Sequence, residues 1–409
     1  MLNWANQFNI FCFLDSHSYA QQPASFDYIL AAGSLQRISL SEPGAFEHLQ
    51  KVHESSPCWL FGHLGYELKN QSFPSYNNKP DRIGFGKGHF FEPEFILRVK
   101  NNIVEILSHH MPCEKIFNLV NDSKVVVEKI FVNPVIQQGM SKDKYLQTIE
   151  TLRSHIQRGD CYEINYCQEF FANDTHLDPI KIYHELSGIS PNPFAALYKL
   201  DDKYCICQSP ERYLKKEGSK VFSQPIKGTV ARNDNNSESD LKNKNFLQNS
   251  PKEKAENVMI VDLVRNDLSR VCLEGSVEVE ELFGIYAFPH LYQMISTIKG
   301  SLPPDMAFTE VIKASFPIGS MTGAPKHKVL QLIDKYEQAG RGLFSGSIGY
   351  ITPGADFDFN VVIRSIFYNS SKSCISFWAG SAITFYSKAE DEYNECMLKA
   401  KAIIKVLES

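Results

Sequence analysis

Long hydrophobic runs are absent from this sequence of 409 residues. The longest runs, such as Ile10–Leu14, are far shorter than the ~18 to 20 apolar residues that a membrane-spanning helix needs. The N-terminus also lacks the cationic start, the apolar stretch and the small-residue cleavage site of a secretory signal. We therefore expect a cytoplasmic protein with no membrane partner.

A surplus of basic residues is missing as well. Lys and Arg number 42 against 47 Asp and Glu, which gives a net charge of −5. A protein that binds nucleic acid usually carries a basic balance or a basic stripe, and neither is visible here. The charge pattern therefore predicts no nucleic-acid partner.

Cysteine motifs for metal or redox chemistry are also absent, although the chain has ten cysteines. The closest pair, Cys205 and Cys207, has one residue between its members, whereas a C-x-x-C motif has two. In a chain without a secretory signal, such cysteines are expected to be reduced and mostly buried thiols.

What the sequence does contain is enough apolar material for a large core. Hydrophobic residues make up 43% and aromatic residues 12%, which is ordinary globular composition. At about 150 residues per domain, the length predicts two to three domains or one large one. Two polar stretches interrupt the pattern: we expect a long loop at Lys69–Gly88, and a surface loop leading into a helix at Arg232–Lys244.

Strand-like and helical segments are mixed along the chain. Ser141 is expected to cap a helix over Lys142–Arg158, which Gly159 ends. The other expected helices are Pro251–Leu268, Met306–Ser315, His327–Tyr336 and Ala389–Leu407. The expected strands are Cys58–Tyr66, His89–Val99, Ile164–Ala172, Phe194–Leu200, Tyr204–Ser209, Ser347–Tyr350, Phe359–Tyr368 and Cys374–Ala379. Because strands and helices do not alternate one for one, the pattern favours an α+β fold with antiparallel sheets and helices outside.

Two acidic pairs lie on two of the expected helices. Glu253 and Glu256 form one E-x-x-E pair, and Glu392 and Glu395 form the other. A spacing of three residues places both carboxylates of a pair on one helix face. If the two helices face each other, four hard oxygen ligands converge, which is the donor set that Mg²⁺ prefers.

The same pairs have a plainer interpretation. Many E-x-x-E pairs are solvated helix faces whose carboxylates contact nearby lysines, and Lys252, Lys254 and Lys399 are close enough in sequence to be such partners. The spacing alone leaves both interpretations open.

A lysine and a glutamate stand in unusual surroundings. Lys227 lies in the segment QPIKGT between a proline and a glycine, where it either caps a surface turn or lies in a cleft as a nucleophilic amine. Glu211 follows a proline after an expected strand, where it either pairs with Arg212 or acts as a general acid.

Two glycine-rich segments and one arginine complete the candidates. The segments Phe316–Lys326 and Gly342–Tyr350 do not match a dinucleotide fingerprint or a P-loop, and their backbone N–H groups either bind anionic oxygens or simply form turns. Arg364 ends an apolar strand-like run, where it either clamps a carboxylate or is a solvated charge.

Taken together, these segments resemble the family of chorismate-utilising enzymes, which includes anthranilate synthase component I, aminodeoxychorismate synthase component I, isochorismate synthase and salicylate synthase. The motifs occur in the family's order from about Ser141 to the C-terminus: SPER, PIKGT, AEN-x-MIVDLVRNDLSRV, SFPIGSMTGAPK, FSGSIGY, VVIRS and E-x-x-E-x-x-x-K. The resemblance implies a sandwich of large antiparallel sheets with helices outside. It also implies an N-terminal segment over residues 1–132 and a chorismate-binding catalytic domain over residues 133–409, interwoven in one globule.

The position of Lys227 separates activities within this family. Anthranilate synthases carry alanine there, in PIAGT, whereas aminodeoxychorismate synthases carry lysine, in PIKGT. Isochorismate and salicylate synthases use a water-activating lysine at the position of Glu163, and a glutamate cannot act in the same way. The resemblance is therefore closest to aminodeoxychorismate synthase component I, a transferase of the transaminase class that starts 4-aminobenzoate and folate synthesis.

The resemblance implies a role for each candidate residue. Glu211 protonates the departing C4 hydroxyl of chorismate, Lys227 attacks C2 to form a covalent adduct, and ammonia then adds at C4 and expels the lysine. The implied substrate-binding residues are Gly228, Thr229, Thr322, Arg364, Gly380 and Lys399.

The resemblance also implies the metal ligands. Glu256 and Glu395 hold Mg²⁺ directly, and Glu253 and Glu392 act through waters. The metal in turn binds the ring carboxylate of chorismate.

Three positions depart from the family pattern. Ala382 replaces a glycine of the usual A-G-x-G segment, Tyr386 replaces an aspartate, and Gln293 stands where histidine is common. Ala382 puts the local geometry of the pocket in question.

The implied nitrogen source is a partner protein. No G-x-C-x-G nucleophile segment with a later His–Glu pair is visible, so we expect a separate glutamine amidotransferase subunit to supply ammonia. Two alternatives remain open: anthranilate synthase component I, and a non-catalytic chorismate-binding subunit. A tryptophan site near Leu14–Ser16, known in parts of the family, is a further hypothesis.

Overall fold

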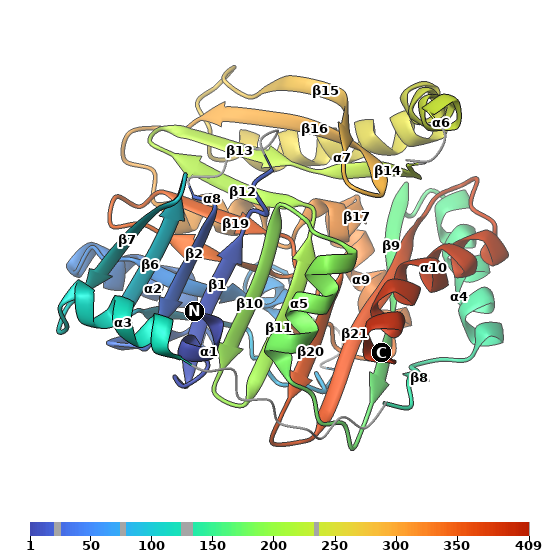
Figure 1. The fold of residues 1–409 in the computed structure, drawn as a ribbon. Helices are drawn as coiled ribbons and strands as arrows, with labels where there is room; N and C mark the ends of the chain where they lie inside the picture. The colour runs from blue at the N-terminus through green and yellow to red at the C-terminus, as the bar shows by residue number, and fades with distance from the viewer. Residues whose placement is uncertain (20–25, 74–78, 124–133, 233–236, 409) are drawn as a thin grey trace.

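Two antiparallel β-sheets packed face to face form the centre of the molecule (Figure 1). The computed structural model describes residues 1–19, 26–73, 79–123, 134–232 and 237–408. None of the described helices is long and apolar enough to cross a membrane.

The first sheet has eleven strands. In spatial order they are β17 (Gly323–Ala324), β9 (Glu163–Ala172), β21 (Cys374–Ile383), β20 (Ser365–Asn369), β11 (Lys203–Ser209), β10 (Phe194–Leu200), β1 (Ile10–Asp15), β2 (Tyr28–Ala32), β6 (Phe95–Lys100) and β7 (Ile103–Ser108), with β8 (Gln137–Gln138) paired to β9.

The second sheet has ten strands. In spatial order they are β14 (Ile226–Ala231), β16 (Leu291–Ser301), β13 (Lys220–Gln224), β12 (Arg212–Glu217), β19 (Phe357–Asn360), β18 (Ser347–Ile351), β4 (Leu60–Leu64), β5 (Gly88–Glu92) and β3 (Gln36–Ser39), with β15 (Glu278–Ala287) paired to β16.

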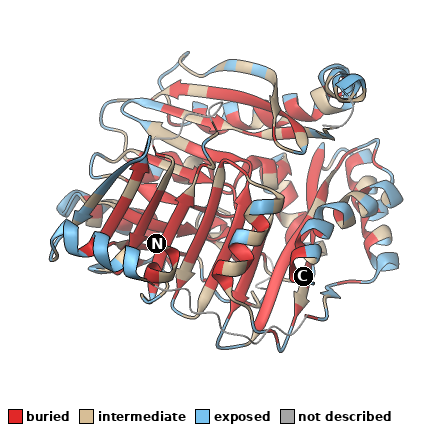
Figure 2. Cartoon of the chain, in the orientation of Figure 1, coloured by how far each residue is buried: buried red, intermediate tan, exposed pale blue. Residues whose placement is uncertain are grey.

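Helices cover the outer faces of both sheets (Figures 1 and 2). The helices and helical turns are α1 (Leu2–Ala5), α2 (Ala45–Ser55), η1 (Tyr66–Gln71), α3 (Cys113–Asp122), α4 (Lys142–Gln157), α5 (Pro179–Ile189), α6 (Ser237–Asn249), α7 (Pro251–Ser269), α8 (Phe308–Ser315), η2 (Gly319–Met321), α9 (Lys326–Tyr336) and α10 (Ala389–Leu407). Strands are largely buried, whereas the helices expose one face.

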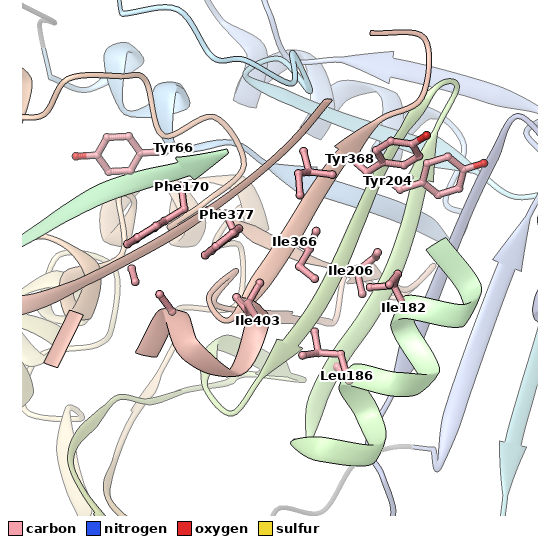
Figure 3. Packing of buried hydrophobic residues seen from close by; sticks show 14 of the residues in the cluster. Tyr66, Phe170, Ile182, Leu186, Tyr204, Ile206, Ile366, Tyr368, Phe377 and Ile403 are labelled. Carbon is pink, nitrogen blue, oxygen red and sulfur yellow. The ribbon is translucent and has the colours of Figure 1, made fainter. Parts of the chain in front are cut away.

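Alternation along β1 shows how the layers form. Phe11 and Phe13 point to the face covered by helices, and Cys12 and Leu14 point to the interface between the sheets. Successive side chains of a strand point to opposite faces, so a strand that is apolar throughout must be covered on both sides. Figure 3 shows the helix-covered face, where α5 packs its apolar residues against β11 and β20.

Strands from the first third of the chain lie inside both sheets. β1 pairs with β10, and β4 pairs with β18, so early and late segments share hydrogen-bonded ladders. The expected boundary between residues 132 and 133 lies outside the described residues.

The expected α+β sandwich with helices outside is confirmed. All ten cysteines are free thiols and seven of them are buried, as expected. The predicted helix cap is also confirmed, because the Ser141 side chain accepts a hydrogen bond from the backbone N–H of Lys144. The predicted helix end is confirmed too, since Gly159 adopts a φ of 82° directly after α4.

Three of the sequence-based predictions are wrong in detail. The single strand expected at Phe359–Tyr368 is two strands, because the chain crosses from the second sheet to the first where Arg364 adopts a φ of 51°. The strand expected at His89–Val99 divides in the same way into β5 and β6. The helix expected to follow the loop at Arg232–Lys244 is present, but it begins earlier than predicted, at residue 237.

Candidate active site

A β-bulge in β14 positions Lys227. Ile226 pairs with Ile295 and Thr229 with Gln293, so β14 carries one residue more than its partner strand between these pairs. Gly228 provides the positive φ of 95° that such a bulge needs, and Lys227 next to it is buried. The surface-turn interpretation of this lysine is therefore wrong.

The ammonium group of Lys227 contacts a carboxylate on the other sheet. Its Nζ lies 2.6 Å from Oε1 of Glu163, the first residue of β9, and Glu163 is fully buried. Burial alone would lower the pKa of Lys227, but the charges of Glu163 and Glu256, the hydrogen bond to Glu163 and the charge of Glu211 raise it above its usual value.

Glu211 lies between β11 and β12 and is also buried. Its Oε1 accepts a hydrogen bond of 2.5 Å from the hydroxyl of Ser320 in η2. Burial raises the pKa of Glu211 to about 7, against the opposing effects of this hydrogen bond and the charges of Lys227 and Arg364. Such a carboxyl is suited to general acid catalysis near neutral pH.

The alternative pairing of Glu211 with Arg212 is not found. The guanidinium group of Arg212 instead binds Asp358, with its Nε 3.0 Å from Oδ1 and its Nη2 3.1 Å from Oδ2. Glu211 is therefore free of its neighbour in the chain and faces Ser320.

The first acidic pair lies at the start of α7. Ser250 caps this helix by accepting a hydrogen bond from the N–H of Glu253, and Pro251 occupies its first turn. Glu256 is buried, and burial raises its pKa to about 7, against the charge of Lys227. Burial also raises the pKa of Glu253.

The second acidic pair lies at the start of α10. Glu392 is buried, and its Oε2 has no hydrogen-bond partner among the described residues. Glu395 accepts a 2.8 Å contact from Lys399, whose Nζ also donates to the carbonyl of Gly380. Burial would raise the pKa of Glu395, but the charge and hydrogen bond of Lys399 lower it.

The two acidic pairs converge on one lysine. Burial would lower the pKa of Lys252, but the charges of Glu256, Glu392, Glu253 and Glu395 raise it. Carboxylates from α7 and α10 therefore both face the ammonium group of Lys252. The interpretation of the two pairs as solvated helix faces does not predict this convergence. Lys252 and Lys399 are nonetheless their partners in this structure, at 3.8 Å for Lys252 and Glu256.

The donor set fits Mg²⁺ in its chemistry. All four groups are hard carboxylate oxygens, and two buried atoms, Oε1 of Glu256 and Oε2 of Glu392, have no hydrogen-bond partner among the described residues. Within that part of the chain, no three His, Cys, Asp or Glu side chains already lie close enough together to hold a metal.

The remaining predicted residues occupy different surroundings. Arg364 is half-buried, and burial lowers its pKa to about 10, against the charge of Glu211. Thr229 is exposed. Thr322 is fully buried and donates its hydroxyl to the carbonyls of Ile318 and Gly319, so that it holds the turn that carries Ser320.

Gly380 is required by the packing of the first sheet. A Cβ atom at this position would lie 2.1 Å from the carbonyl oxygen of Tyr166 on β9. The glycine therefore allows β21 and β9 to approach closely beside the site.

The three departures from the family pattern are accommodated. Ala382 pairs with Asn165 in an uninterrupted β21, and Tyr386 is exposed. Gln293 is buried beside Thr229, and its Oε1 has no hydrogen-bond partner among the described residues.

Sequence reasoning missed two contacts of the candidate site residues. It assigned no role to Glu163, although a glutamate directly before the largely apolar strand expected at Ile164–Ala172 is a signal of a buried charge with a partner. It also missed Ser320, whose contact with Glu211 joins segments more than a hundred residues apart and leaves no local pattern.

The segment of the tryptophan hypothesis lines a small cavity. Leu14, Asp15 and Ser16 border it together with Phe26 and Phe194. The hydroxyl of Ser16 donates to the carbonyl of Asp27. Tryptophan binding here stays a prediction.

Comparisons with known proteins show the family to which the chain belongs. The model of the chorismate binding enzyme family matches residues 11–405. The chain is 38% identical over 364 residues to an aminodeoxychorismate synthase of Arabidopsis thaliana, covering 83% of this chain and 39% of that protein. It is 36% identical over 272 residues to aminodeoxychorismate synthase component 1 of Escherichia coli, covering 66% of this chain and 59% of that protein.

The solved structures agree on the fold. Anthranilate synthase component I of Streptococcus pneumoniae superposes with a TM-score of 0.81 at 24% identity, covering 94% of this chain and 93% of that one.

The chain spans less than two thirds of the length of either aminodeoxychorismate synthase relative. Because the family model matches nearly the whole chain, this chain belongs to the chorismate binding enzymes.

Proposed function

We propose that the chain is aminodeoxychorismate synthase component I, which converts chorismate and ammonia into 4-amino-4-deoxychorismate in the cytoplasm. One observation carries the proposal: the amine of Lys227 and the carboxyl of Glu211 are both buried and interact electrostatically at one site. Relatives named aminodeoxychorismate synthase support it.

The two residues divide the first half of the reaction. Glu211, with a pKa raised to about 7 by burial, holds the proton that the C4 oxygen of chorismate needs in order to leave as water. Lys227 attacks C2 and the ring double bonds shift. Covalent catalysis of this kind replaces one difficult substitution by two easier ones.

The second half of the reaction brings in nitrogen. Ammonia attacks C4, the bond between C2 and Lys227 breaks, and the lysine is released. A separate glutamine amidotransferase subunit supplies the ammonia in the cell, which agrees with the name component 1 of the bacterial relative.

The carboxylates of α7 and α10 supply the metal site of this proposal. Glu256 and Glu395 would hold Mg²⁺ directly, with Glu253 and Glu392 behind them. Mg²⁺ held there would supply positive charge for the ring carboxylate of the substrate. Arg364 lies near Glu211, where its cation is available to the other substrate carboxylate.

The nitrogen source provides the test. The purified chain is incubated with chorismate and Mg²⁺, with either ammonium or L-glutamine as the nitrogen donor. The proposal predicts amination with ammonium and none with glutamine until a glutaminase subunit is added. Amination with glutamine by the pure chain would contradict the separate partner, and no reaction in any arm would contradict the enzyme assignment.

A further inference from the structure

The contact between Glu163 and Lys227 has chemical consequences beyond holding the lysine in place. Oε1 of Glu163 lies 2.6 Å from Nζ of Lys227. The other carboxylate oxygen, Oε2, is buried and has no hydrogen-bond partner among the described residues. This carboxylate is therefore in direct contact with the atom that reacts in the proposed mechanism and keeps one oxygen unengaged.

An ammonium group cannot act as a nucleophile, so Lys227 must lose a proton before it attacks. The charged groups that face it most strongly are Glu163 from β9, Glu256 from α7 and Glu211 from the segment before β12. Glu253 from α7 and Glu395 from α10 face it as well. Glu211 is hydrogen-bonded to Ser320, and the ion-pair contact of Glu256 is with Lys252. Among these five carboxylates, Glu163 is the one that makes a hydrogen bond to Nζ in the described part of the chain.

We propose that Glu163 is a further catalytic residue, which accepts the proton of Lys227 before the attack on the substrate and returns it when the lysine is released. The inference rests on the proposed function for the identity of the nucleophile. It assigns a role to a residue that composition and spacing left without one.

The protons balance over the cycle. In the first half, Lys227 passes a proton to Glu163 and forms the bond to C2, which leaves the new secondary amine protonated. The ring double bonds shift, the bond from C4 to oxygen breaks, and Glu211 protonates the departing oxygen, which leaves as water. In the second half, ammonia forms the bond to C4, the C2–N bond breaks with its electron pair going to Lys227, and Glu163 returns its proton to that amine. The new C4 ammonium gives its extra proton to Glu211, so both carboxyls return to their starting states.

Burial makes this transfer reasonable. A charged lysine and a charged glutamate both lose much solvation free energy in a closed site, whereas the neutral amine and carboxylic acid lose far less. When substrate excludes water, proton transfer within the pair replaces two buried charges by two neutral groups. The pair then behaves as one proton-sharing unit.

The experiment measures adduct formation directly. Wild-type enzyme, Glu163→Gln and Glu163→Asp are mixed with chorismate and Mg²⁺ without ammonium and quenched in acid, and the mass of the Lys227 peptide is followed over time. We expect Glu163→Gln to form the adduct about 100-fold more slowly near pH 7, because the proton must then reach solvent. We expect its rate relative to wild type to rise about tenfold per pH unit, whereas Glu163→Asp keeps the wild-type profile.

A matched control comes from the same strand. Glu169→Gln makes the same chemical change at another buried glutamate of β9, six residues beyond Glu163. The side chain of Glu169 contacts Arg82 and Ser376 instead of Lys227. It is expected to leave the adduct rate and its pH dependence unchanged, so that a general effect of removing a buried carboxylate is excluded.

The outcomes separate the two proposals. A wild-type enzyme that forms the adduct and yields no aminated product on adding ammonium would overturn the proposed function and leave the test of Glu163 intact. A wild-type enzyme that forms no adduct on Lys227 would overturn the role of Glu163. A Glu163→Gln enzyme with the wild-type pH profile would overturn it as well.

Discussion

The carboxyl oxygen of Glu211 accepts a hydrogen bond of 2.5 Å from the hydroxyl of Ser320, and both residues are buried. The contact joins the segment before β12 to the helical turn η2. It stabilises the ionised form of Glu211, so it opposes the burial that raises the pKa of this carboxyl to about 7.

This relationship predicts the pH dependence of the reaction. A general acid must be protonated, so we expect kcat to fall as the pH rises through about 7, the pKa of Glu211. Ser320→Ala removes a hydrogen bond that lowers this pKa, so the falling limb is expected to move to higher pH. Steady-state kcat measured against pH checks both statements. If kcat of Ser320→Ala fell over the same pH range as kcat of the wild type, Glu211 would not be the general acid.

The glycine of the β14 bulge is expected to tolerate no side chain. Gly228→Ala places a Cβ at a φ of 95°, 3.0 Å from Leu247 and 3.1 Å from Glu253. The conformation alone costs about 1 to 2 kcal/mol, and crowding adds to it. Gly218→Ala is the control, because Gly218 has a φ of 59° with nothing within 4 Å of its Cβ position. Urea unfolding should show the larger loss of stability at Gly228, with a loss of activity at that position alone.

The lysine among the four carboxylates is expected to compete with the metal. Lys252→Met removes the cation that faces the glutamates of both helices, so we expect half-maximal activity at a lower Mg²⁺ concentration. Lys254→Met on the same helix is the control, since its ammonium lies over the ring of Phe283. Each variant is treated with a chelator, and its activity is then measured against the concentration of added Mg²⁺. We expect the curve of Lys252→Met to move to lower Mg²⁺ and the curve of Lys254→Met to match that of the wild type. Equal curves for Lys252→Met and wild type would count against a metal at this place.

A buried ion pair connects strand β9 to the helical turn η2, which carries Ser320. Arg341 binds Glu337 through two contacts of 2.7 and 2.9 Å and donates to the carbonyls of Met321 and Asn165. Arg341→Met leaves the carboxylate of Glu337 buried without its cation, while the N–H of Cys167 still donates to it. Removing one partner of a buried ion pair typically costs about 3 to 5 kcal/mol.

An exposed ion pair provides the comparison. Lys313→Met breaks a partly exposed contact of 2.7 Å with Glu47, and such pairs are worth about 1 kcal/mol or less. Chemical denaturation of both variants should rank Arg341→Met as much the less stable. Equal losses would show that the Arg341 network adds little beyond a surface ion pair.

Much of the fold follows from local patterns in the sequence. The bounds of β10 and α10 match the expected segments, because β10 is a short, nearly continuous apolar run and the buried residues of α10 recur at helical spacing. Phe359–Tyr368 was expected to be one strand, because both halves are apolar and nothing local shows that the chain changes sheets at Arg364.

The site was less predictable than the fold. The pattern QPIKGT indicated that Lys227 is special, but the bulge that turns it inward depends on pairing with β16. Its partner Glu163 lies 64 residues earlier on the other sheet, and no periodicity connects two such positions. Contacts of this kind arise only when the two sheets pack together.

Product identity tests the proposed amination most directly. The purified chain is incubated with chorismate, Mg²⁺ and ammonium, without any added lyase, and the products are identified by liquid chromatography and mass spectrometry. We predict 4-amino-4-deoxychorismate, with its enolpyruvyl group retained and no pyruvate released. Fluorescent anthranilate together with pyruvate would contradict the proposal and identify the chain as an anthranilate synthase component I.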